Sequence, residues 1–194
     1  KSSHSFPTRR SSDLTSIDSG EEMELALQAA ETRQVIGVMN VSGAADAVFR
    51  LLVNGVLATT LARSLRLVLV QRLVPRLCAD CRVAKPASAA MLKSLGIDAA
   101  LLNASGAADN GREAPCFFQP RGCPACSGKG YRGLQLIVEA LEMNDELQRL
   151  VHKPDVVRAD FEIAAGRAGW MPFRKKAFVY ALQGVIRVED AVMG

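Results

Sequence analysis

Four cysteines in two closely spaced pairs constrain this chain more than any other feature of its sequence. The pairs are "CADC" at 78–81 and "CPAC" at 123–126. A CxxC turn directs both sulfurs to one point, and two such turns supply the four thiolates of a tetrahedral zinc site. The sequence therefore predicts structural zinc with no open position for catalysis. The predicted ligands are Cys78, Cys81, Cys123 and Cys126.

The surroundings of the two pairs favour a metal over disulfide bonds or redox chemistry. We expect no secretory signal, because no apolar stretch follows the charged N-terminus, and disulfides are then the poorer interpretation. Two pairs in one short chain argue against a redox motif. Gly128 and Gly130 allow the backbone to fold back, so that amides can donate to sulfur. The fifth cysteine, Cys116, has no partner at ligand spacing and is interpreted as a bystander thiol.

The two pairs are far apart in the chain. Between Cys81 and Cys123 lie 41 residues, whereas common zinc ribbons use about 15–20. A metal here would close a long loop and hold the base of an insertion over 82–120. The insertion contains an alanine-rich helix around 88–95, and we expect it to have little core of its own.

The rest of the chain alternates helical and strand patterns, which predicts an α/β protein. Apolar spacing, N-caps and Gly or Pro boundaries place the elements. We expect helices at 21–32, 42–55, 56–70, 144–151, 155–169 and 172–184, and strands at 34–40, 71–78 and 134–143. The strand at 34–40 is a short apolar run and is predicted to be buried. Pro75 confines the second strand to an edge or a bulge.

The ends and the overall charge add three expectations. Residues 1–20 have no periodic apolar face and are predicted to be disordered, and "KSSHSFPTRRSSDL" (1–14) resembles a translated sequencing adapter. The apolar stretch 51–70 contains Arg63 and Arg66, which argue against a membrane span. The net charge of +4 is compatible with an acidic partner or a membrane surface and does not require nucleic acid.

The residues flanking the cysteines resemble one family of motor proteins. "SLRLVLVQRLVPRLCADC" (64–81) is similar to a segment of the type II secretion and type IV pilus assembly ATPases, and "GCPACSGKGYRG" (122–133) is similar to their second zinc half. "VEALEMNDELQRLV" (138–151) and the tail "GVIRVEDAVMG" (184–194) follow in the same order. Residues 24–52 match the helix, strand and helix around the family's histidine box.

The resemblance implies the C-terminal portion of a RecA-like P-loop ATPase domain with an inserted tetracysteine zinc element and a helical C-terminal subdomain. Its segments would be a disordered or artefactual head (1–20), a partial ATPase core (21–77), the zinc element (78–133) and the helical subdomain (134–194). The family implies a cytoplasmic hexamer, peripheral to the bacterial inner membrane, that docks on a membrane platform protein and uses ATP and Mg²⁺ to assemble pseudopili or pili. A basic tip with Lys129, Tyr131 and Arg132 is the expected docking point.

The departures from the family concern catalysis. The phosphate-binding loop G-x-x-x-x-G-K-[ST] is absent, as are the acidic motifs that handle Mg²⁺ and water. Asn40 and Val41 stand where the histidine box has His and Thr, and Asn cannot titrate as His does. We therefore assign no catalytic or nucleotide-binding residue and expect the chain alone to be inactive. A truncated fragment, a degenerate paralogue and a standalone adaptor all fit this pattern.

A second functional class stays open at this point. "CPACSGKG" also fits one half of the zinc module of J-domain chaperones, which binds unfolded client protein. That family uses several such halves, but "LCADCRVAK" (77–85) lacks the expected glycines. The helices predicted after residue 140 have no place in that module.

Overall fold

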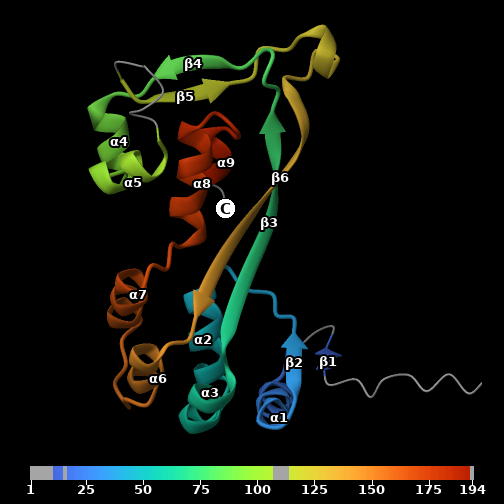
Figure 1. Cartoon of the computed structure of the whole chain (residues 1–194), viewed down its shortest axis with the longest axis vertical. Helices are drawn as coiled ribbons and strands as arrows, with labels where there is room; N and C mark the ends of the chain where they lie inside the picture. Colours follow the sequence, from blue (N-terminus) through green and yellow to red (C-terminus); the bar gives the residue numbers. More distant parts are fainter. Residues whose placement is uncertain (1–10, 15–16, 107–113, 193–194) are drawn as a thin grey trace, which may run out of the picture. The chain divides into compact units, whose positions relative to one another are not determined.

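The structure is a computed structural model that describes residues 11–14, 17–106 and 114–192. It divides the chain into two compact units (Figure 1). Unit 1 comprises residues 1–69 and 140–170, and unit 2 comprises residues 70–139 and 171–194. These boundaries differ from those of the four segments that the family resemblance implies. The four-segment division stays a prediction.

Unit 1 combines a small parallel sheet with helices. The strand β1 (Ser11–Leu14) pairs in parallel with β2 (Gln34–Gly37). The helices are α1 (Gly20–Ala30), α2 (Ala44–Val53), α3 (Ala58–Ser64), α6 (Asp145–Val151) and α7 (Arg158–Arg167). Their apolar faces meet in one interior, where Phe49 and Phe161 pack edge to face with ring centres 5.6 Å apart. The fully buried side chains include Met23, Val48, Leu61, Leu147 and Phe161.

Unit 2 contains the longer strands and the cysteines. The strand β3 (Leu67–Leu77), which begins in unit 1, pairs with β6 (Tyr131–Glu142), which ends there. The strand β4 (Val83–Pro86) pairs antiparallel with β5 (Cys116–Gln119). The helices are α4 (Ala89–Leu95), α5 (Ala99–Ala104), α8 (Phe173–Leu182) and α9 (Val188–Val192), with a 3-10 turn η1 at Pro124–Cys126.

The interior of unit 2 is built around α8, which lies within the helix predicted at 172–184. Its apolar stripe, Phe173, Ala177, Phe178, Ala181 and Leu182, is buried throughout. The insertion over 82–120 has little core of its own, as expected. Its residues Ile97, Leu101 and Phe117 are buried in the same cluster as α8. The insertion gains its core from a segment that follows about 70 residues later in the chain.

Three local expectations need correction. The strand at 34–40 is predicted to be buried, but Ile36 and Val38 are more than half exposed. The single helix at 56–70 is α3 followed by β3, because "LRLVLV" alternates β-branched valines with other residues and so favours a strand. The prediction that the chain is disordered up to residue 20 is wrong for the described part of that stretch. Ser11–Leu14 form β1, and Ile17 is buried.

The cap of α1 explains why ordered residues occur before residue 21, where the predicted helix begins. Ser19 is the N-cap, and its hydroxyl accepts the Glu22 N–H at 3.2 Å. The Glu22 carboxylate in turn accepts the Ser19 N–H at 3.0 Å, which completes a capping box. Residues 1–10 and 15–16 lie outside the described part of the chain. Within the described residues, no helix has the length and apolarity needed to cross a bilayer.

Candidate metal centre

The four cysteines of the two pairs converge in unit 2, as predicted. Cys78 and Cys81 follow the end of β3. Cys123 directly precedes η1 and Cys126 is its last residue, just before β6 begins. β3 and β6 are hydrogen-bonded neighbours, so their pairing brings the two turns together. The Cys78 N–H donates to the Gly130 carbonyl at 2.9 Å and fixes the two turns against each other. All four sulfurs lie within 4.8 Å of one another.

The sulfur separations test whether the site fits zinc. A tetrahedral Zn–S bond of about 2.3 Å requires sulfurs about 3.8 Å apart. The Sγ–Sγ distances are 3.9 Å for Cys78–Cys123 and 3.8 Å for both Cys81–Cys126 and Cys123–Cys126. These distances are far too long for disulfide bonds, and all five cysteines are free thiols. The arrangement therefore fits a four-thiolate metal site.

Two glycines shape the second turn. Gly130 has a φ of +76°, and a Cβ there would lie 2.4 Å from the Cβ of Pro120. Gly122 has a φ of +92°, and its Cβ would lie 2.5 Å from the Gly128 carbonyl oxygen. The sequence analysis named Gly130 and missed Gly122, although the position directly before a ligand cysteine was the available signal. The Gly130 N–H donates to Cys126 Sγ at 3.1 Å, as expected for an amide that stabilises a thiolate.

The thiols have opposite tendencies to ionise. Burial raises the pKa of Cys81 to about 11, and the neighbouring thiols add to this rise against one hydrogen bond from the Gly122 N–H. Burial also opposes ionisation of Cys126, but the Cys123 and Gly130 N–H groups and two neighbouring thiols together lower its pKa to about 6. Four thiolates at this spacing need a cation to offset their mutual repulsion. A bound metal would supply that charge and would have no open coordination position.

The predicted basic tip, Lys129, Tyr131 and Arg132, is exposed at two of its three residues. Lys129 and Arg132 are exposed, as expected, and so is Arg121. Tyr131 is instead half-buried, with the Arg187 guanidinium 5.7 Å from its ring centre. Burial accordingly raises the pKa of the Tyr131 phenol. Cys116 lies in β5 and does not belong to the cluster.

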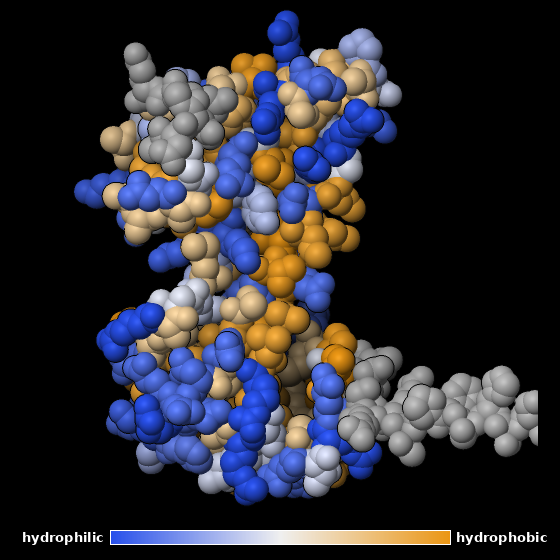
Figure 2. Space-filling model, in the orientation of Figure 1, coloured by the Kyte–Doolittle hydropathy of each residue, from blue (hydrophilic) through white to orange (hydrophobic). Residues whose placement is uncertain are grey.

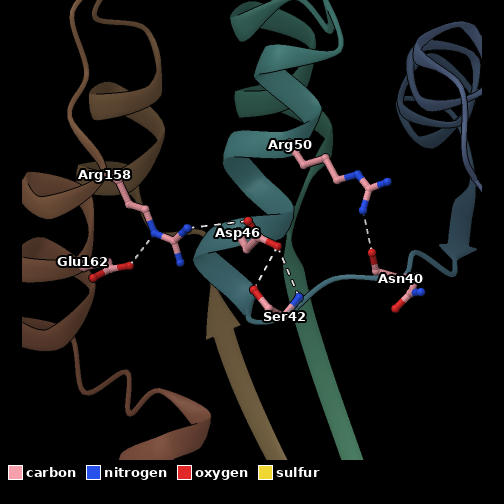
Figure 3. A network of polar contacts seen from close by, with 6 residues as sticks. All are labelled: Asn40, Ser42, Asp46, Arg50, Arg158 and Glu162. Carbon is pink, nitrogen blue, oxygen red and sulfur yellow. Dashed lines mark hydrogen bonds and ion pairs between the residues drawn. The ribbon is translucent and has the colours of Figure 1, made fainter. Parts of the chain in front are cut away.

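A second region of interest is the loop in unit 1 where the sequence resembles the family's histidine box (Figure 3). The carbonyl of Asn40 accepts a hydrogen bond from Arg50 Nη1 at 2.6 Å. The Asp46 carboxylate accepts from both the N–H and the hydroxyl of Ser42, at 3.2 and 3.1 Å. The same carboxylate lies 3.5 Å from Arg158 of α7. These contacts hold the loop through its backbone, while the exposed Asn40 side chain lacks the titratable group of a histidine.

Comparisons with known proteins identify a matching family and several relatives. The model of the family "Type II/IV secretion system protein" matches residues 16–192. Type II secretion system protein E of Pectobacterium carotovorum subsp. carotovorum is 33% identical over 151 residues, which cover 77% of this chain and 28% of that protein. Type IV pilus assembly ATPase PilB of Thermus thermophilus is 30% identical over 177 residues, which cover 91% of this chain and 19% of that protein.

Solved structures show the same fold at low sequence identity. The pilus retraction motor PilT with bound ADP aligns over 95% of this chain and 39% of its own, with a TM-score of 0.56 and 16% identity. The Legionella pneumophila ATPase DotB aligns over 95% of this chain and 38% of its own, with a TM-score of 0.58 and 15% identity. The chain thus spans less than a third of the curated relatives quoted above. On the extent of the family match, this chain belongs to the type II/IV secretion ATPase family.

Proposed function

We propose that this chain acts as the C-terminal segment of a motor ATPase that powers assembly of a pseudopilus or a type IV pilus. The family match from residue 16 to residue 192, with the four-cysteine site inside it, is the observation that carries the proposal. The related proteins are, by name, a type II secretion system protein and a type IV pilus assembly ATPase. The chaperone alternative gains no support, because the match continues through α6–α9, beyond any zinc module.

The chain alone is proposed to be inactive towards ATP. Its sequence has no phosphate-binding loop, so no ring of backbone amides with a lysine is available to hold the phosphates. Asn40 occupies the place of the family's histidine, in a loop held by Arg50 and Asp46. Catalysis would require the nucleotide-binding part of a motor, working with this segment in a hexamer of the kind the family forms.

Zinc held by Cys78, Cys81, Cys123 and Cys126 is proposed to have a structural role. The metal would stiffen the end of unit 2 that carries Arg121, Lys129 and Arg132. A rigid basic end is suited to docking, since preorganisation reduces the ordering cost of binding. We propose the cytoplasmic part of the inner-membrane platform protein as its partner, which would place the chain in the cytoplasm at the inner membrane.

Two surface properties of unit 2 support a role inside a larger assembly. Unit 2 has thirteen Lys and Arg residues against seven Asp and Glu residues, a net charge of +6, which favours an acidic partner. Leu73 of β3 and Leu134 and Leu136 of β6 are 63%, 59% and 44% exposed. Figure 2 shows apolar residues gathered over this part of the two strands. Exposed apolar groups at this density mark interaction surfaces.

Two experiments test the proposal. Calorimetry with ATP and Mg²⁺ should show no saturable binding to the isolated chain, and turnover above the buffer rate would contradict the assigned inactivity. A pull-down with the cytoplasmic part of the platform protein should lose capture when Lys129 and Arg132 are both changed to Glu. Lys93→Glu, at an exposed position on α4, is the matched control and should bind normally. Equal capture by both variants would place the contact elsewhere.

A further inference from the structure

The residues flanking the metal centre hold the C-terminal segment formed by residues 183–190. We infer that metal binding and docking of this segment are thermodynamically linked. The metal holds two segments of the chain, called arms here, in contact with residues 183–190; one arm runs through each cysteine pair. The docked segment in turn strengthens metal binding. This inference rests on the metal site of the proposed function and extends it to Arg82 and Arg187, which touch no ligand sulfur.

The first arm runs from the end of β3 through the first cysteine pair. Arg82 directly follows Cys81, and its Nη1 donates to the carbonyl oxygens of Gln183, at 3.3 Å, and Gly184. These carbonyls lie at the C-terminal end of α8, where helix carbonyls lack partners within the helix and a positive charge is favourable. Just before the pair, the Leu77 N–H donates to the Val185 carbonyl at 2.8 Å. The ligand turn is thus flanked on both sides by contacts to the C-terminal segment.

The contact at Gly184 is closely packed. The Arg82 guanidinium lies over the Phe118 ring of β5, 5.1 Å from its centre. The same ring lies against Gly184, because a Cβ there would be only 2.7 Å from Phe118 Cδ2. Gly184 also has a φ of +73°, which glycine adopts without strain. Arg82, Phe118 and Gly184 therefore form a stack that depends on the position of Arg82.

The second arm runs through the second cysteine pair into β6. Tyr131 directly follows Gly130, whose N–H donates to Cys126 Sγ. The Tyr131 ring packs under the Arg187 guanidinium, which Asp190 holds with hydrogen bonds of 2.9 and 3.2 Å. Upstream of the pair, the Gln119 amide donates to the Glu189 carboxylate at 2.9 Å. This arm therefore holds residues 187–190, whereas the first arm holds residues 183–185.

The physical reason for linkage is preorganisation. Metal bound by the four sulfurs joins the two arms. The side chains of Arg82 and Tyr131 can contact residues 183–190 only when both arms are fixed. Ordering a long side chain such as Arg costs conformational entropy, and this cost is reduced when the backbone that carries it is already held in position. Linkage is reciprocal: if bound metal strengthens docking by a given factor, docking strengthens metal binding by the same factor, so a change that abolishes docking must weaken metal binding.

The test measures zinc affinity by competition with a chromophoric chelator. Arg82→Gln and Arg187→Gln should each bind zinc at least about fivefold more weakly, the lower end of typical coupling between sites. Arg76→Gln is the matched control, since this exposed arginine lies two residues before Cys78 and should leave affinity unchanged. Equal affinity in all three variants would overturn the linkage while leaving the metal site intact. A wild-type chain that binds no zinc would overturn both.

Hydrogen exchange of the wild-type chain gives an independent readout. Removing zinc with a chelator should lower the protection of amides at 183–192, and restoring zinc should recover it. Amides of α2 in unit 1 are the internal control and should keep their protection, which separates local release from global unfolding. Unchanged exchange at 183–192 after complete metal removal would refute the inference even if the arginine variants fold poorly.

Discussion

Glu139 is the buried charge whose removal should affect the fold most directly. It lies in β6 and is only 1% exposed. Its carboxylate accepts the N–H of Phe173, the first residue of α8, at 3.1 Å. The Arg72 guanidinium packs over the ring of the same phenylalanine, 4.7 Å from its centre. Glu139 thus caps the N-terminus of the helix around which the interior of unit 2 is built.

The expected cost follows from this geometry. A hydrogen bond to a charged group contributes about 1.5–3 kcal/mol, and a negative charge at a helix N-terminus adds about 0.3–1 kcal/mol. Glu139→Gln keeps the volume and an acceptor oxygen but removes the charge, so it should destabilise the protein by about 1–2 kcal/mol. Glu139→Ala also leaves the buried Phe173 N–H without this acceptor, so it should cost about 2–4 kcal/mol.

The assay is urea unfolding followed by the fluorescence of Trp170, the single tryptophan, which lies three residues before α8. Glu142→Gln, at an exposed position of the same strand, is the control and should change stability by less than about 0.5 kcal/mol. The reasoning fails if Glu139→Gln is as stable as the wild type, or if Glu142→Gln loses as much. In either case the carboxylate would not be acting as the cap of α8.

Three further outcomes are expected. Elemental analysis should find one zinc per chain, lost in Cys123→Ser and retained in Cys116→Ser, because only the former removes a ligand; full occupancy in the first variant would contradict the site. Ser19→Ala should lower stability by about 1 kcal/mol through loss of the α1 cap, measured by thermal unfolding against Ser94→Ala. Gly184→Ala should destabilise unit 2 by more than about 1 kcal/mol, since its φ and the Phe118 ring both exclude a Cβ; an unchanged melting temperature would refute this.

Local patterns in the sequence were sufficient for the cluster of four cysteines and for several helices. The two CxxC spacings identified all four cysteines of the cluster, because each pair sits on one short turn. The buried stripe of α8 follows the helical period, and Asn144 caps α6 as its position suggested. The family resemblance was also readable, since it rests on the order of short motifs. Such features depend on residues close together in the chain.

Contacts between distant segments were settled only by the tertiary structure. "VEALE" contains Glu139 and Glu142, and nothing in that stretch distinguishes the buried cap from the exposed residue. The half-buried Tyr131 and the exposed strand β2 were likewise mispredicted, because burial depends on which segments pack nearby. Arg82 and Gly184 are 102 residues apart, and no sequence period relates them. Their contact exists because β3 and α8 pack in one interior, which places the metal centre beside the end of a helix.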